Sequence, residues 1–380
     1  MKNLEIYMHI PFCIRKCGYC DFLSAPAGRN VQEKYVRALE REIRGRAGEY
    51  EKYQVPTVFI GGGTPSILEP GQIKRLLDAL HNNYQVLPGA EITMEANPGT
   101  VDYDALMQYH RAGVNRLSLG LQSSWDEELK ALGRIHTWQQ FLDAYRAAAA
   151  AGFVHVNVDL MSGLPGQSIA SYEETLRRVA ELQPGPEHIS AYSLIIEEGT
   201  AFAERYGAGA LELPDEDTER ELYGLTKRIL QEYGYRRYEI SNYAKEGCEC
   251  RHNVGYWTRE NYLGFGVGAA SLVENVRFQN GKNLQAYLEE PLRQREQEQR
   301  LTAAEQMAEY MFLGLRLTAG VGEREFYEIF HCEMEQVYGD AIKKHIKQGL
   351  LAYRAGTAGR YLYLTDRGLD LANYVMADFV

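Results

Sequence analysis

Three cysteines near the start of the chain have the types and spacing that could do chemistry. Cys13, Cys17 and Cys20 follow the apolar segment 5–10 in the order C-x3-C-x2-C. Thiolates bind iron and zinc, and a loop that leaves a strand can fold three of them around one small centre. A four-iron cluster with three cysteine ligands keeps one iron without a protein ligand. A small molecule can bind that open iron.

Two other interpretations of these cysteines stay open at this point. A structural zinc ion takes four ligands, and His9 precedes the cysteines closely enough to supply the fourth. Buried thiols that only pack in the core are the other interpretation. The short spacing of three thiolates favours the open iron cluster over both.

The elements that must position these cysteines alternate along the first half of the chain. Segments that predict strands are 5–10, 57–60, 91–96, 116–121, 154–160 and 188–194. Amphipathic segments that predict helices are 31–44, 71–80, 103–111, 138–151 and 171–182. Strands separated by helices form a parallel sheet, and six are too few for a closed eight-stranded barrel. The predicted fold class is therefore α/β, a partial six-unit (β/α) barrel.

Glycine and polar residues gather where these predicted strands end. The second strand runs into Gly61-Gly62-Gly63-Thr64-Pro65, where glycine lets the backbone approach a ligand and offer its amides. The next three strands end near Glu95, Gln122 and Asp159. An unpaired polar group in an apolar strand costs on the order of a few kcal/mol, so each needs a partner, which can be an internal ion pair or a ligand. Because ligands bind at the carboxyl ends of parallel strands, we expect one shared site with the cysteines.

The cysteine spacing, with the aromatic Tyr19 before the last cysteine, resembles the motif of the radical S-adenosylmethionine (SAM) enzymes. In that family SAM chelates the open iron of a 4Fe-4S cluster, and an electron from the cluster cleaves SAM to a deoxyadenosyl radical. The resemblance implies that Cys13, Cys17 and Cys20 ligate the cluster. Other residues fall where the oxygen-independent coproporphyrinogen III oxidase-like group carries its SAM contacts, namely Tyr7, Gly62, Gly63, Thr64, Glu95, Gln122, Arg134 and Asp159.

Two features resemble a sister branch of that group, the heme chaperones of the HemW type. Phe22 stands where the true oxidase has a further cysteine, and Cys13 is too close to the start for the oxidase's long N-terminal extension. The segment His252-Asn253-x-x-Tyr256-Trp257 resembles the heme-binding signature of that branch. The resemblance implies heme contact by His252, supported by Asn253, Tyr256 and Trp257, since imidazole ligates heme iron. Without it, a histidine beside aromatic residues is more often a hydrogen-bonded core residue.

Composition narrows the class of protein further. The formal net charge of -11 disfavours a general nucleic-acid binder, because phosphate contacts need a basic face. The chain has no run of eighteen apolar residues, and Met1-Lys2-Asn3 leads directly into a predicted strand. Its six cysteines are clustered, which is typical of metal or redox use in a reducing compartment. We therefore expect a cytoplasmic protein without stable membrane insertion.

The second half of the chain predicts a smaller C-terminal domain. The charged segment 289–300 predicts an exposed helical connector. Beyond it the pattern predicts a winged-helix-like domain with helices 303–317, 323–329 and 334–348, a hairpin over 351–364 and a closing helix over 366–376. This domain carries more acidic than basic residues, which argues against DNA binding. The predicted division is a barrel over 1–235, an extension with the heme-binding segment over 236–290, and the C-terminal domain over 301–380.

The function predicted from this resemblance is that of a heme chaperone that binds heme and transfers it to an acceptor protein. It would carry the 4Fe-4S cluster and exchangeable SAM, and a small electron-transfer protein such as flavodoxin or ferredoxin would be a partner. No catalytic residue is assigned. The alternative is the enzyme of porphyrin biosynthesis that oxidatively decarboxylates coproporphyrinogen III. A zinc-stabilised binding module is the third possibility.

Overall fold

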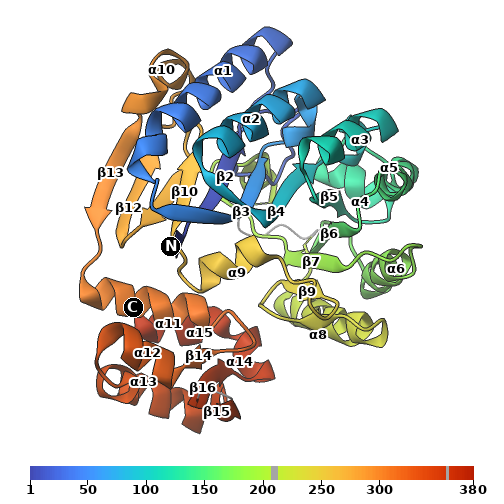
Figure 1. Cartoon of the computed structure of the whole chain (residues 1–380). Helices are drawn as coiled ribbons and strands as arrows, with labels where there is room; N and C mark the ends of the chain where they lie inside the picture. The colour runs from blue at the N-terminus through green and yellow to red at the C-terminus, as the bar shows by residue number, and fades with distance from the viewer. Residues whose placement is uncertain (207–212, 357–358) are drawn as a thin grey trace.

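The centre of the fold is a mixed sheet with six parallel strands (Figure 1). The structure is a computed structural model and describes residues 1–206, 213–356 and 359–380. The six strands lie side by side in chain order: β2 (Glu5–Ile10), β3 (Tyr53–Gly62), β4 (Gln85–Ala96), β5 (Arg116–Gln122), β6 (His155–Ser162) and β7 (His188–Ser193). Among the described residues the outermost strands of the sheet do not pair with each other, so the barrel is open. The predicted α/β fold with a partial barrel is confirmed.

Amphipathic helices cover the outer face of these strands (Figure 1). They are α1 (Arg29–Arg46), α2 (Pro70–Asn83), α3 (Tyr103–Ala112), α4 (Asp126–Leu132), α5 (Trp138–Ala150), α6 (Ile169–Ala180) and α8 (Glu216–Glu232). The short helix α7 (Ala201–Tyr206) packs instead against the loop that carries the cysteines, where the amide of Phe202 donates to the carbonyl of Gly18 at 2.9 Å. In α1, Tyr35, Leu39 and Ile43 recur every four residues and are fully buried. Burial of each such side chain contributes about 1.5–3 kcal/mol.

Four further strands extend the sheet on the β2 side. β10 (Tyr262–Phe265) pairs parallel with β2, and β11 (Ala270–Val273), β12 (Val276–Asn280) and β13 (Arg295–Arg300) follow antiparallel. The prediction of a helical connector over 289–300 was therefore wrong. After α10 (Leu284–Glu289) and a single turn at Pro291–Arg293, the charged residues form an edge strand held by backbone bonds to β12. Its side chains face solvent, so the charge pattern carried no strand signal.

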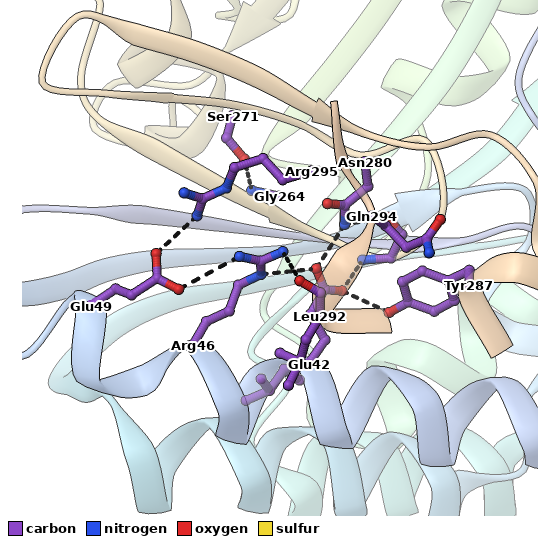
Figure 2. A network of polar contacts seen from close by, with 12 residues as sticks. Glu42, Arg46, Glu49, Gly264, Ser271, Asn280, Tyr287, Leu292, Gln294 and Arg295 are labelled. Atoms are coloured by element: carbon purple, nitrogen blue, oxygen red, sulfur yellow. Dashed lines mark hydrogen bonds and ion pairs between the residues drawn. The ribbon is translucent and has the colours of Figure 1, made fainter. Parts of the chain in front are cut away.

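A buried carboxylate ties this extension to α1 (Figure 2). Glu42 accepts hydrogen bonds from the hydroxyl of Tyr287 at 2.7 Å, from Nδ2 of Asn280 at 2.7 Å and from the amide of Gly266 at 2.9 Å. Nε of Arg46 lies 3.4 Å from its Oε1. Burial raises the pKa of Glu42, and these donors act against that rise. The strand extension and the barrel are thus joined by one fully buried polar cluster.

The C-terminal part forms a compact unit with its own core. It contains α11 (Ala303–Gly314), α12 (Glu323–Phe330), α13 (Met334–Lys347), α14 (Asp366–Asp370) and α15 (Ala372–Met376), with a small sheet of β14 (Val321–Gly322), β15 (Leu351–Gly356) and β16 (Gly359–Leu364). The predicted hairpin is present, and its tip at 357–358 lies outside the described residues. The closing segment is two short helices instead of one, because Leu371 has a non-helical backbone.

Helix α9 (Arg251–Trp257) lies between the sheet and this C-terminal unit (Figure 1). The guanidinium of Arg316 stacks 4.3 Å from the ring centre of Trp257, and Glu309 of α11 forms an ion pair with Arg259 at 3.1 Å. Two antiparallel strands, β9 (Asn242–Ala244) and β8 (Arg236–Arg237), extend the sheet beyond β7. Over the described ranges, none of the helices combines the length and apolarity that a membrane crossing requires.

Candidate functional site

The cysteine loop follows β2 and folds over the carboxyl end of the parallel strands. Cys13, Cys17 and Cys20 all line one cavity at that end. The hydroxyl of Thr64 donates to Sγ of Cys13 at 3.4 Å, and Nη1 of Arg134 lies 3.8 Å from Sγ of Cys17. Two of the three sulfur atoms therefore lie within reach of a hydrogen-bond donor at the cavity wall.

Most of the residues predicted to contact the cluster or SAM surround this same cavity. Its lining includes Cys13, Cys17, Cys20, Gly62, Gly63, Thr64, Glu95, Gln122, Arg134 and Asp159. Tyr7 is outside that lining, and its hydroxyl is hydrogen bonded to Nδ1 of His9 at 2.9 Å. The site residues on α9 lie elsewhere.

The glycines after β3 allow the cysteine loop to pack directly on that strand. Gly62 has a φ of +110°, and a Cβ there would lie 2.4 Å from the ring of His9. A Cβ on Gly63 would lie 2.5 Å from the carbonyl oxygen of Phe12. The amides of Gly62 and Gly63 donate to Glu95 and to the carbonyl of Ile10 at 3.0 and 2.8 Å. These glycines therefore permit the close contact between the cysteine loop and β3, and their two amides are bonded within the protein instead of being free for a ligand.

Two carboxyl groups give the cavity an acidic wall. Asp159 accepts from the hydroxyl of Ser118 at 3.0 Å and from Nδ2 of Asn157 at 2.8 Å. Burial, and then the charge of Asp159, raises the pKa of Glu95 to about 8. Burial also raises the pKa of Asp159, against the effect of its hydrogen bonds. A cationic group that enters the cavity would favour the charged form of both, so the wall suits an ammonium or sulfonium ligand.

Arg134 and Gln122 form another part of the wall. Nη2 of Arg134 donates to the carbonyl of Gly120, and its Nε is enclosed without a hydrogen-bond partner among the described residues. Gln122 ends β5 with a φ of 76°, a left-handed conformation that a non-glycine residue rarely adopts. Together with the acidic wall, the guanidinium makes the cavity suited to a zwitterion, an amino acid moiety with ammonium and carboxylate groups. The donor set therefore fits both a thiolate-held cluster and SAM.

Asp159 is held in place by a network of polar side chains that the sequence analysis did not predict. Oδ1 of Asn157 accepts from Nδ1 of His188 at 2.6 Å and from the hydroxyl of Ser190 at 3.1 Å. Nε2 of His188 then accepts from the hydroxyl of Tyr238 at 2.8 Å. Ser118, Asn157 and His188 are register partners on β5, β6 and β7. Polar residues at matching positions of consecutive strands were the available signal.

His9 does not offer a fourth zinc ligand. Its Nε2 donates to the carbonyl of Leu23 at 2.9 Å, so its Nδ1 is the acceptor for the hydroxyl of Tyr7. Within residues 1–206, 213–356 and 359–380, no three His, Cys, Asp or Glu side chains are grouped to hold a single metal ion. A four-iron cluster takes each thiolate on a different iron and does not need such a group.

His252 lies at the opposite end of the sheet from the cysteines. Its Nδ1 is hydrogen bonded to the hydroxyl of Thr57 at 2.8 Å and its Nε2 to the hydroxyl of Tyr256 at 3.1 Å. The ring stacks on Phe59 with centroids 5.3 Å apart. Burial lowers the pKa of His252 to about 3, so the ring is neutral. In this structure His252 has the contacts of a core histidine, with both ring nitrogens engaged.

The rest of the predicted heme segment follows His252 along α9. Glu91 accepts from the amides of Arg251 and His252 at 3.1 and 3.0 Å, which anchors the start of the helix to β4. Asn253, Tyr256 and Trp257 are half-buried. The structure therefore brings together the cluster and SAM residues in one cavity and places the heme segment apart from them.

Two family models match the chain. The model of the radical SAM superfamily matches residues 7–179, and the model of the HemN C-terminal domain matches residues 301–371. A Lactococcus lactis protein named heme chaperone HemW is 36% identical over 380 residues, which cover 100% of this chain and 98% of that protein. A Bacillus subtilis protein of the same name is 35% identical over 98% of each chain. An Escherichia coli protein of that name is 42% identical over 285 residues, 75% of this chain and 73% of that protein.

A solved structure has the same fold. Coproporphyrinogen III oxidase (HemN) from Escherichia coli superposes with a TM-score of 0.85 over 100% of this chain and 90% of that chain, at 24% identity. Its likeness extends through both the open barrel and the C-terminal unit. The fold, the family models and relatives more than a third identical along nearly their whole length agree with one another. The chain therefore belongs to the HemW family of the radical SAM superfamily.

Proposed function

We propose that this chain is a cytoplasmic heme chaperone, which binds heme and transfers it to an acceptor protein. The observation that carries this proposal is its similarity, from end to end, to proteins named heme chaperone HemW. The acceptor and a small electron carrier such as flavodoxin or ferredoxin are the protein partners in the same proposal.

The second part of the proposal concerns the cysteine cavity. Cys13, Cys17 and Cys20 would hold a 4Fe-4S cluster, and the open iron would bind exchangeable SAM. When bound, the cluster supplies an electron that can cleave SAM. The chain's own residues would bind and orient SAM: Glu95 and Asp159 can receive its cationic groups, and Arg134 its carboxylate or ribose. The full set of proposed SAM contacts is Tyr7, Gly62, Gly63, Thr64, Glu95, Gln122, Arg134 and Asp159.

The third part is heme contact by His252, with Asn253, Tyr256 and Trp257 in support. The geometry sets a condition on it. Nε2 of His252 is engaged by the hydroxyl of Tyr256, so ligation of iron by His252 requires that bond to break. Tyr256→Phe removes the hydroxyl and keeps the ring. If His252 ligates the iron, Tyr256→Phe should bind heme at least as tightly as the wild type, and His252→Ala should bind it much more weakly.

The experiment begins with anaerobic reconstitution of the full chain, followed by iron and sulfide analysis. Heme titration and coproporphyrinogen III turnover are then measured side by side. The proposal predicts saturable heme uptake, bound iron and sulfide, and no turnover. Turnover that survives His252→Ala would support a decarboxylase instead, and the absence of sulfide would contradict the cluster. Thermal melts of each variant separate a lost ligand from a lost fold.

A further inference from the structure

A second cavity opens at the end of the sheet away from the cysteines. It lies between β4, the starts of β5 and β6, and the segment that leads into α9. Arg116, His155, Arg251 and Val254 are among the residues that line it. Helix α9 therefore forms part of this cavity with one side and presents His252 to the protein core with the other.

Arg116 is the unusual residue of this cavity. It begins β5, and the residue is only 4% exposed. Its Nη1 donates to the carbonyl of Cys248 at 3.3 Å, whereas Nη2 is enclosed and has no hydrogen-bond partner within the described part of the chain. An enclosed guanidinium with an unmet donor is destabilising unless an acceptor such as water or an anion satisfies it, and an anion also offsets its charge. A ligand of the cavity can supply that anion.

The charges around Arg116 leave room for such an anion. Arg251 adds a second guanidinium, which is exposed and donates to the carbonyl of Gly89 at 3.1 Å. Glu91 and Glu249 also line the cavity. The carboxylate of Glu91 already accepts the amides at the start of α9, and within the described ranges neither acid forms an ion pair with Arg116. The cavity thus has an inner and an outer guanidinium.

We propose that this cavity binds the carboxylate groups of a tetrapyrrole, with Arg116 as the inner contact and Arg251 as the outer one. This inference rests on the proposed heme function and adds a contact to it. Heme is an apolar macrocycle with two propionates, and Arg is the side chain best suited to carboxylates. The cavity is lined by Arg251 and Val254 of α9, so its ligand would lie against the helix that carries the predicted heme segment, on the side facing away from His252.

The test compares heme with heme dimethyl ester, which has the same iron and ring but no carboxylates. The wild-type chain should bind heme about tenfold or more tightly than the ester, the effect of one or two charge-assisted hydrogen bonds. Arg116→Gln should reduce this preference to about twofold and leave the affinity for the ester unchanged. Arg146→Gln is the matched control, because that arginine is exposed on α5 and away from the cavity. It should keep the wild-type preference.

The outcomes separate the carboxylate contact from the proposed heme function on which it rests. Equal binding of heme and ester by the wild type would overturn the carboxylate contact and leave the heme function standing. No saturable binding of either would overturn both. An Arg116→Gln variant that weakens heme and ester equally would show that Arg116 only supports the fold. If that variant does not fold, exposed Arg251→Gln serves instead, with an expected loss of about threefold in preference, and an unchanged preference would overturn the proposal.

Discussion

Gly255→Ala should show how tightly α9 is pressed onto the parallel strands. A Cβ at position 255 would lie 2.0 Å from Oε1 and 2.3 Å from Cδ of Glu5. Glu5 cannot move aside, because it is 3% exposed on a strand paired on both sides by β3 and β10. The helix would have to retreat by about 1.4 Å to turn the 2.0 Å contact into the 3.4 Å of ordinary van der Waals packing.

The effect of Gly255→Ala on the free energy of unfolding has two opposing parts. Overpacking a closed core costs about 1–3 kcal/mol, and this site belongs at the upper end because the obstacle is a buried carboxyl. Replacing glycine by alanine in a helix returns about 1 kcal/mol. The expected net loss in the free energy of unfolding is therefore about 2 kcal/mol. The hydrogen bonds of His252 to Thr57 and of Glu91 to the helix start should weaken as well.

Urea denaturation followed by circular dichroism measures this loss. The matched control is Gly224→Ala in α8, an exposed helical glycine whose added Cβ meets nothing within 4 Å. It should stabilise the chain by about 0.5–1 kcal/mol. Adding Glu5→Ala to Gly255→Ala removes the obstacle, so the double mutant should recover at least about 1 kcal/mol relative to additivity. A Gly255→Ala variant as stable as Gly224→Ala would refute the packing argument.

Three further predictions follow from buried groups and from the cysteine cavity. His252 is neutral in the fold, with a pKa near 3, but binds a proton near pH 6.5 when the chain is unfolded. The free energy of unfolding should therefore fall by up to about 1.4 kcal/mol per pH unit below pH 6.5. Denaturation at pH 7 and pH 5 checks this, and a His252→Gln variant should have a shallower dependence. Glu42→Ala leaves buried donors, including the Tyr287 hydroxyl, without an acceptor and should cost about 3–5 kcal/mol in a urea melt; a loss below 1 kcal/mol would contradict the role of this cluster. Gly62→Ala should reduce the iron bound after anaerobic reconstitution, since its Cβ would meet His9 at 2.4 Å, whereas Gly71→Ala, with nothing within 4 Å, should bind iron like the wild type.

Local patterns predicted the existence and the order of the six parallel strands, although β3 and β4 begin at Tyr53 and Gln85, earlier than the predicted 57 and 91. The bounds of β2 were predicted to the residue, and Glu95 and Asp159 were placed at strand ends that do converge on the cysteines. Parallel strands explain this success, because their carboxyl ends must meet at one edge. A strand-end residue in a βα unit can therefore be assigned to a site before any contact is known.

What the sequence could not predict depends on contacts between distant segments. Arg134 lies in a loop, where no local pattern assigned it to the site; only the family resemblance did so, and the folded chain shows its side chain in the cavity wall beside Cys17. The hydrogen bonds of His252 reach Thr57, which is 195 residues away. A local sequence pattern cannot indicate a partner so far along the chain. The hydrogen bonds of both ring nitrogens of His252 could therefore not be predicted. The strand β13 escaped prediction for a related reason, because only its backbone pairs with the sheet.

The placement of the cysteine cavity and α9 at opposite ends of the same strands has a chemical consequence. At about 3.3 Å per residue, the six residues of β2 alone separate the two ends by roughly 17 Å. Under the proposed function, a carbon radical formed at the cysteine cavity could not reach a porphyrin bound near α9, since hydrogen abstraction needs atoms in contact. Coupling between the two ends would then require electron transfer over that distance or a movement of the strands. The bound heme would be protected from oxidative damage by the radical.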